Sequence, residues 1–153
     1  MSFDLVHAVT EADWARVQSV RRRVFIEEQA VPEADEWDAW DAPHARGRTV
    51  HHLLATDGDE VLGCARWRAV ERDGRPWAKL ERFAVVPEAR GRGVGRFLVR
   101  SALDDARSAG HRRFVLHAQR YVARLYAGFG FETEGEPFQE DGIEHVKMTL
   151  VEA

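Results

Sequence analysis

The sequence predicts an α/β (α+β) fold, with a mixed, mostly antiparallel twisted sheet of about six to seven strands flanked by helices. Three strand-like runs follow one another between residues 50 and 86, separated by short Gly-containing turns, which is typical of an antiparallel meander. A strand, a Gly-rich turn, a long amphipathic helix and another strand then occupy residues 80–118, and this order requires a right-handed parallel crossover. Two further strand-like runs lie at 131–137 and 143–151.

The chain begins with a strand and a helix. Residues 3–9 alternate in polarity, which predicts the strand. Thr10 follows as a helix N-cap, with Asp13 three residues further on as a shorter relative of the capping box. Apolar residues then recur at helical spacing over residues 14–25, so we expect a helix there.

The middle of the chain contains an acidic loop, three strands and the long helix. Residues 33–48 are acidic and aperiodic; loops of this length are usually functional or disordered, and the Trp and His residues favour an ordered one. Residues 50–56, 61–70 and 77–86 are the strands of the meander. The helix is expected over residues 93–109, because its apolar side chains share one face.

The end of the chain completes one architectural unit. A buried-type strand at 113–118 and a short helix at 121–128 precede the last two strands. The order of elements has no internal repeat and no linker, and 153 residues with 44% hydrophobic content suffice for one core. We therefore expect a single domain over residues 1–153.

Composition and charge exclude several functional classes. The formal net charge is −4 and the sequence has no basic tail, so duplex nucleic acid is not an expected partner. No apolar stretch approaches the ~20 residues of a membrane span. The N-terminus lacks the features of a signal peptide, so we expect a cytoplasmic location. Cys64 is the only cysteine, which excludes an internal disulfide and a cysteine-based zinc site.

The histidines do not form a metal-binding motif. His51 and His52 are adjacent in a predicted strand, so their side chains point to opposite faces of the sheet and cannot share one ion. No His-Glu-x-x-His or Cys/His pattern is present, and we expect no metal. One of these two residues, together with His117 and His145, either contacts substrate or satisfies sheet packing.

The most specific local pattern is a Gly-rich turn, Arg-Gly-Arg-Gly-Val-Gly, at residues 90–95. It joins a strand to a helix N-terminus, where free backbone N–H groups and the helix dipole favour a phosphate or pyrophosphate. The Lys of a Walker A loop is missing, and Arg96 takes the place of the third glycine of a dinucleotide fingerprint. The spacing of Arg90, Gly93 and Gly95 instead fits the pattern Gln/Arg-x-x-Gly-x-Gly/Ala.

This pattern resembles the pyrophosphate loop of the Gcn5-related N-acetyltransferases, the GNAT superfamily, and the element order resembles the GNAT fold over nearly the whole chain. Residues 80–109 resemble motif A of that family. Residues 114–131 resemble motif B, with its Leu-Tyr-x-x-x-Gly-Phe ending. Within the superfamily, residues 22–32 and 140–148 resemble the ElaA-like branch.

The resemblance implies an acetyl-CoA-dependent N-acetyltransferase that acts on a primary amine of a small molecule or peptide, with the parallel crossover at the cofactor site. The alternative is a non-catalytic acetyl-CoA sensor or regulatory module. The sequence leaves a monomer and a homodimer both open.

The resemblance also implies which residues bind acetyl-CoA. The backbone amides of Phe83 and Val85 would face the pantetheine arm, and one of them would donate to the thioester oxygen. The pyrophosphate would lie on the turn formed by Arg90, Gly91, Arg92, Gly93, Val94, Gly95 and Arg96.

Two side chains are the candidates for proton transfer. Tyr126 matches the family's Tyr and would protonate the leaving thiolate, since a phenol (pKa ~10) is still protonated at neutral pH; alternatively it is a core Tyr. Glu81 lies in the strand before the Gly-rich turn and would accept the amine proton. The alternative for Glu81 is an ion pair with Arg66 or Arg68 on the preceding strand.

Two acidic segments lie far apart in the sequence, the loop at residues 33–44 and the segment at 132–144. In the family's fold the acceptor approaches near these regions. Together they predict an acidic funnel that attracts a cationic amine. The alternative is that these carboxylates only form a solvated surface.

Overall fold

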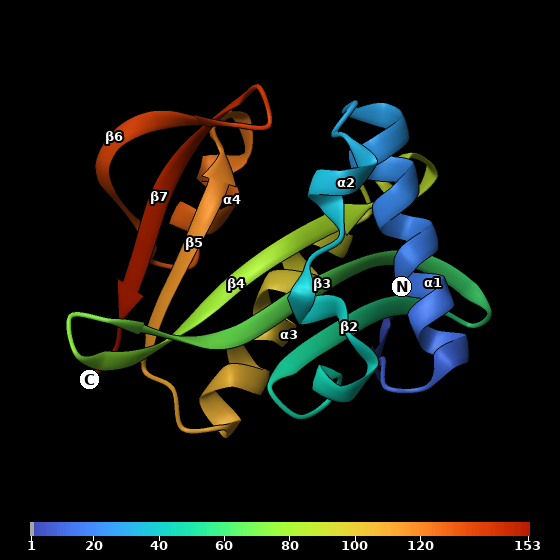
Figure 1. The fold of residues 1–153 in the computed structure, drawn as a ribbon, viewed down its shortest axis with the longest axis horizontal. Helices are drawn as coiled ribbons and strands as arrows, with labels where there is room; N and C mark the ends of the chain where they lie inside the picture. Colours follow the sequence, from blue (N-terminus) through green and yellow to red (C-terminus); the bar gives the residue numbers. More distant parts are fainter. Residues whose placement is uncertain (1) are drawn as a thin grey trace.

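The computed structural model describes residues 2–153 and contains one seven-stranded sheet with helices on both faces (Figure 1). The strand order is β1-β2-β3-β4-β5-β7-β6, and every neighbouring pair is antiparallel except β4 and β5. This arrangement confirms the predicted fold class. The strands are β1 (Asp4–His7), β2 (Val50–Asp57), β3 (Glu60–Arg72), β4 (Arg75–Val85), β5 (Arg113–Gln119), β6 (Glu132–Glu140) and β7 (Ile143–Val151).

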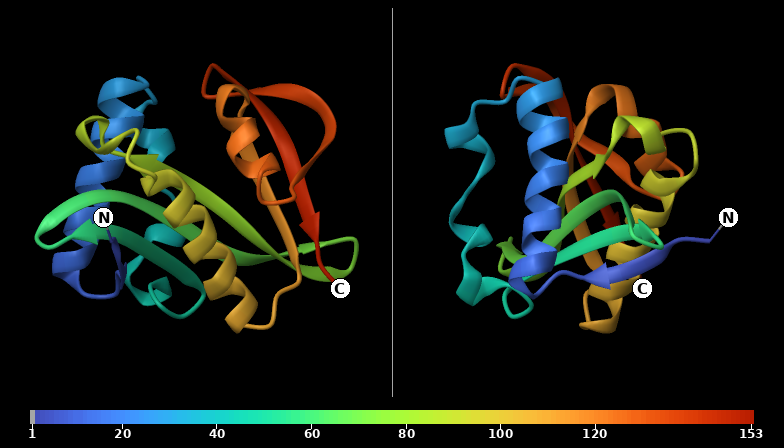
Figure 2. Two further views of the ribbon diagram at one scale, coloured as in Figure 1. Left: turned by 180° about the vertical axis from the view of Figure 1, so that it is seen from behind. Right: turned by 90° about the vertical axis from the view of Figure 1, so that its right-hand side faces the viewer.

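The helices cover the two faces of the sheet unequally. Helix α1 crosses the face in front of β2, β3 and β4, whereas α3 packs on the opposite face (Figures 1 and 2). The α-helices are α1 (Glu11–Arg21), α2 (Glu33–Glu36), α3 (Val94–Ser108) and α4 (Ala123–Ala127). A π-helical segment, η1 (Arg22–Glu28), continues α1, and short 3-10 turns occur at η2 (Ala39–Asp41), η3 (Pro43–Ala45), η4 (Pro87–Ala89) and η5 (Arg120–Val122).

Local signals in the sequence fix the ends of the two long helices. The Thr10 hydroxyl accepts a hydrogen bond from the Asp13 amide at 3.1 Å, so the predicted N-cap of α1 is confirmed. Gly110, with φ of 98°, follows the end of α3 in the left-handed conformation that favours glycine. Within residues 2–153, no helix is both long enough and apolar enough to cross a membrane.

The acidic loop is ordered and contains short helical turns. The sequence has no period there, and the structure nevertheless places α2, η2 and η3 within it. Asp38 caps η2 by accepting from the Trp40 amide at 3.0 Å, and its own amide donates to Asp41 at 3.0 Å. These turns are too short to show helical periodicity, so side-chain capping and ion pairs specify them instead.

The most consequential feature of the sheet is the separation of β4 from β5. The two strands pair only where Ala78–Leu80 face Phe114–Leu116, and beyond that point they diverge (Figure 1). The edge of β4 that faces β5 therefore has no strand partner from Glu81 to Val85. Strand edges of this kind are positioned to hydrogen-bond a ligand.

Candidate active site

A cavity of about 730 Å³ lies at the separation of β4 and β5. Its walls come from β4, the Gly-rich turn, α3, β5, α4, the end of η1 and the hairpin between β6 and β7. This volume is in the usual range for small-molecule and cofactor sites, about 300–1,000 Å³. Because the cavity passes between two strands, it is bordered by residues from both faces of the sheet.

One end of the cavity is formed by the Gly-rich turn and the start of α3. Gly91 and Gly93 have φ angles of 80° and 88°, and a Cβ atom at either position would meet no atom within 4 Å. Gly93 is the N-cap of α3, and no side chain caps that end of the helix. The amides of residues 94–96 therefore lie in the first turn without helical acceptors.

The three arginines of the turn differ in what they contact. Arg90 pairs with Glu28, with Nη1 at 2.6 Å from Oε2, and its Nε donates to the Val85 carbonyl at 3.1 Å. Arg92 lies 3.4 Å from Asp57 and 3.5 Å from Glu60. Arg96 is exposed on the first turn of α3.

The open edge of β4 presents backbone groups to the cavity. The Val86 amide donates to the Leu62 carbonyl of β3 at 3.0 Å. Because backbone groups alternate along a strand, the amides of Phe83 and Val85 face the opposite edge, toward β5. Both residues line the cavity.

A β-bulge at Arg82 sets the direction of this edge. Cys64 faces Ala84 and Arg66 faces Glu81, so Arg82 and Phe83 together oppose a single residue of β3. Arg82 has φ of 57°, which is strained for a side chain of this size. Its Nη2 donates to the Glu36 carbonyl at 3.0 Å, and its Nε lies 3.1 Å from Glu36 Oε2. The acidic loop therefore holds the bulge that directs the Phe83 amide.

Tyr126 lies in the wall of the cavity formed by α4. Its ring packs edge-on against Phe83 and Phe131, at centroid distances of 5.7 and 6.2 Å. Burial raises the pKa of the Tyr126 phenol, so the group is protonated at neutral pH. No group in residues 2–153 hydrogen-bonds the hydroxyl. The residue is thus part of the core, as the alternative interpretation had it, while it also borders the cavity.

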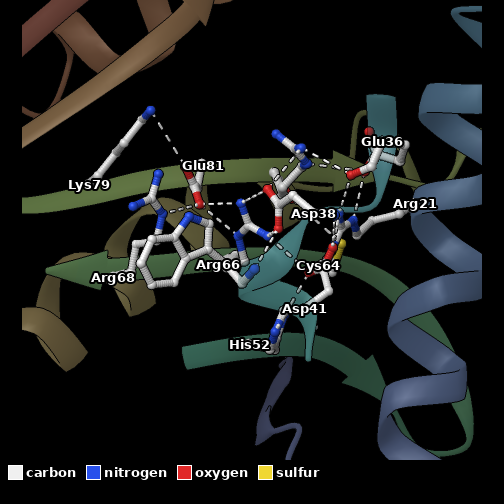
Figure 3. Close-up of polar contacts among 12 residues, drawn as sticks. Arg21, Glu36, Asp38, Asp41, His52, Cys64, Arg66, Arg68, Lys79 and Glu81 are labelled. Atoms are coloured by element: carbon white, nitrogen blue, oxygen red, sulfur yellow. Dashed lines mark hydrogen bonds and ion pairs between the residues drawn. The ribbon is translucent and has the colours of Figure 1, made fainter. Parts of the chain in front are cut away.

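Glu81 borders the cavity from the other face of the sheet and is surrounded by cations (Figure 3). Arg66 Nε donates to its Oε2 at 2.6 Å, Arg68 Nε donates at 3.0 Å, and Lys79 Nζ lies 3.8 Å from Oε1. Burial raises the pKa of Glu81, but Arg66, Arg68 and Lys79 together hold it below its usual range. The expected ion pairs of Glu81 with Arg66 and Arg68 of β3 are therefore present. A carboxylate surrounded by cations in this way is a weak proton acceptor.

Three carboxylates of the early acidic loop, Glu36, Asp38 and Asp41, form ion pairs with arginines (Figure 3). Arg21 Nε donates to Glu36 at 2.7 Å and its Nη1 donates to Asp41 at 2.7 Å, with Arg21 almost fully buried. Arg66 donates to Asp38 at 2.8 Å and to Asp41 at 2.9 Å. These three carboxylates neutralise arginines and are not free to attract a substrate, whereas Asp35 is exposed and lines the cavity, so the acidic funnel stays a prediction.

The histidines are divided between several environments. His51 stacks on Trp67 at 4.2 Å, whereas His52 is buried against Trp14 at 5.0 Å, so the two side chains do point to opposite faces. His117 and His145 line the cavity, which sequence reasoning left undecided. Within residues 2–153, no group of three or more His, Cys, Asp or Glu side chains is arranged to hold a metal ion.

Sequence reasoning missed two sets of residues that shape the site. The bulge at Arg82 carries no sequence signal, because its strained conformation depends on contacts with Glu36, far away in the chain. Two amide side chains, Gln29 and Gln119, also meet across the cavity: Gln119 Nε2 donates to Gln29 Oε1 at 2.8 Å. A pairing between residues ninety positions apart cannot be read from periodicity.

The chain is similar to N-acetyltransferases in both sequence and structure. The family model described as the acetyltransferase (GNAT) domain matches residues 18–152. The uncharacterized N-acetyltransferase YjcF of Bacillus subtilis is 32% identical over 84% of this chain and 86% of its own length. The crystal structure of Escherichia coli ElaA superposes with a TM-score of 0.80 at 25% identity, covering 97% of this chain and 98% of that one. A Thermoplasma acidophilum N-acetyltransferase solved in complex with coenzyme A has the same fold, with a TM-score of 0.74 at 16% identity, over 99% of this chain and 100% of that one.

Proposed function

Because this chain belongs to the GNAT family and is an N-acetyltransferase, we propose that acetyl-CoA is its donor and a primary amine of a small molecule or peptide its acceptor. The observation that carries this proposal is the cavity between β4 and β5, which connects an uncapped helix N-terminus to the phenol of Tyr126. The alternative of a non-catalytic sensor is not favoured, because relatives of the chain carry the name N-acetyltransferase.

The Gly-rich turn suits a pyrophosphate. The amides of residues 94–96 and the positive end of the α3 dipole attract an anion, and the open space over Gly91 and Gly93 admits it. Arg90, Arg92 and Arg96 surround this position and would add charge-assisted hydrogen bonds. We assign most of the affinity to the backbone, since two of these arginines already contact carboxylates.

The open edge of β4 suits the amide-containing pantetheine arm. The backbone groups of Phe83 and Val85 have no strand partner on the side of β5, so the arm can take the place of a neighbouring strand. This placement directs the thioester toward Tyr126, which packs against Phe83 at 5.7 Å.

The residues around this position suit acyl transfer. As the C–N bond forms and the C–S bond breaks, the amide of Phe83 or Val85 would donate to the oxygen that gains negative charge. Tyr126 would donate its phenolic proton to the departing thiolate, and buried phenols are protonated at neutral pH. The family resemblance implies Glu81 as the acceptor of the amine proton, but its three cationic neighbours lower its pKa and weaken it for that role.

Calorimetry with CoA, combined with a thiol-release assay over a panel of amines, tests this function. Gly93→Asp places a side chain and a negative charge at a position with φ of 88°, so we expect the protein to lose CoA binding and turnover. The control is Gly74→Asp, which carries the same chemical change at φ of 74° in the turn between β3 and β4, away from the cavity. Equal CoA affinity in wild type and Gly93→Asp would refute the site, and a wild type without thiol release would refute the activity.

A further inference from the structure

Three side chains from the far half of the sheet meet on one side of the cavity. His117 lies in β5, Glu140 ends β6, and His145 lies in β7, and all three line the cavity. His117 Nδ1 is 3.3 Å from Glu140 Oε1, and His145 Nε2 is 3.6 Å from Glu140 Oε2. The carboxylate thus lies between two imidazole rings and is hydrogen-bonded to the ring of His117.

Strand register places His117 at the same level as Glu81. Leu80 and Leu116 form the last parallel pair between β4 and β5, and both leucines are buried in the core cluster that includes α3. Side chains alternate between faces along a strand, so the next residues, Glu81 and His117, both point to the opposite face. His117 therefore stands where Glu81 was expected to meet the acceptor amine.

Hydrogen bonding determines which nitrogen of His117 is free. A carboxylate only accepts hydrogen bonds, so the contact with Glu140 places the His117 proton on Nδ1 and leaves the lone pair on Nε2. No other group in residues 2–153 forms a hydrogen bond with the His117 ring. A carboxylate that orients an imidazole in this way is the arrangement by which histidine bases are held ready in many enzymes.

The second imidazole is held in place by the hairpin that carries it. His145 Nδ1 donates to the Ile143 carbonyl at 2.7 Å, and the ring stacks on Phe138 at 5.9 Å, so its orientation is set by the β6–β7 hairpin. His117 packs edge-on against the same Phe138 ring at 5.1 Å. Both rings therefore pack against Phe138, which lies on the same strand as Glu140.

The charges that face His117 come from three strands. Lys79 and Glu81 lie on β4, Glu140 on β6, and His145 and Lys147 on β7. Hydrogen bonding to His117 is the largest of the influences that hold the pKa of Glu140 below its usual range, so Glu140 remains a carboxylate near neutral pH. Glu81, by contrast, is neutralised by three cations.

We propose that His117 is the general base of the transfer reaction, with Glu140 and His145 as its positioning residues. The N–H bond of the amine breaks as the C–N bond forms, the proton moves to His117 Nε2, and the electron pair stays with nitrogen to form the amide. Glu140 stabilises the imidazolium that results. The inference rests on the proposed acetyl transfer and replaces Glu81 as the proton acceptor.

The test compares His117→Asn with His44→Asn. An Asn at position 117 can keep a hydrogen bond to Glu140 and has no basic nitrogen, whereas His44 is exposed on η3 and does not border the cavity. We expect kcat/KM at neutral pH to fall about 10²–10⁴-fold in His117→Asn, with CoA affinity unchanged, and to stay constant in His44→Asn. Added imidazole should partly restore turnover in His117→Ala and leave wild type unaffected.

The pH profile distinguishes a base from a structural residue. In wild type, kcat/KM should fall on the acid side of its pH profile as the base becomes protonated, and Glu140→Gln should displace this acid limb toward lower pH. If wild type turns over while His117→Asn keeps its rate and acid limb, the base assignment alone is overturned. If wild type releases no thiol with any amine, the proposed function fails and the assignment fails with it.

Discussion

Arg21 and Arg22 are neighbours in the chain that differ sharply in burial. Their replacement should therefore have different effects on the free energy of unfolding. Arg21 is 1% exposed and pairs with Glu36 and Asp41, whereas Arg22 is 43% exposed and pairs with Glu33, which is 59% exposed. Replacing either residue by Met removes one guanidinium and keeps an unbranched side chain. The Arg21→Met change leaves two buried carboxylates without that partner.

The expected loss of stability follows from the lowered pKa of Asp41. Burial raises the pKa of Asp41, but hydrogen bonding and attraction from Arg21, with smaller contributions from other groups, hold it at about 2, below the ordinary value of 3.8. At about 1.4 kcal/mol for each pKa unit, this depression corresponds to roughly 2–2.5 kcal/mol of stability. Breaking a buried pair typically costs about 3–5 kcal/mol. We therefore expect Arg21→Met to lose about 2–5 kcal/mol of unfolding free energy and Arg22→Met to lose less than about 1 kcal/mol.

The pH dependence supplies a second check. Because the pKa of Asp41 is depressed in the folded state, its contribution is fully present above about pH 4 and is lost as the pH falls toward 2. The difference between wild type and Arg21→Met should therefore shrink in acid, and urea unfolding at several pH values measures it. A loss no larger than that of Arg22→Met, or a difference that does not decrease in acid, would refute the reasoning.

Two further predictions concern the reaction. Tyr126→Phe should lower kcat about 10²–10⁴-fold, while its CoA affinity, measured by calorimetry, stays the same. The control is Tyr121→Phe, at a residue that is 73% exposed. An unchanged kcat of Tyr126→Phe in single-turnover experiments would exclude Tyr126 as the acid. Glu81→Gln should keep the acid limb of the kcat/KM profile, because three cations already hold the Glu81 carboxylate ionised. The same variant should be less stable in urea. If the acid limb disappeared in Glu81→Gln, Glu81 would be restored as the base.

The fold could be predicted largely from local patterns. The hairpin turns, the amphipathic α3 and the Gly-rich turn each depend on residues close together in the chain, and the structure has the corresponding elements. The ion pairs of Glu81 with β3 were foreseen as an alternative because neighbouring strands bring such side chains together.

The parts that could not be predicted depend on long-range pairing. The contact of Arg21 with Asp41 requires the acidic loop to fold back on α1. The acidic residues of the sequence, taken alone, predict an acidic funnel instead. The contact of His117 with Glu140 depends on how the β6–β7 hairpin curves over β5, including a register shift between Glu134 and Phe138. Spacing in the sequence carries no record of either arrangement.

The separation between β4 and β5 divides the sheet mechanically into two halves. The half from β1 to β4 bears the Gly-rich turn, and the half from β5 to β7 bears His117. Within the sheet they are joined by the pairing of Ala78–Leu80 with Phe114–Leu116, and across the cavity the side chains of Gln29 and Gln119 bridge them. A slight rotation about the paired segment would change the distance between a donor bound to one half and a base carried by the other. The contact between Gln29 and Gln119 that spans the cavity is a single pair of side-chain amides, which yields more readily than a strand ladder.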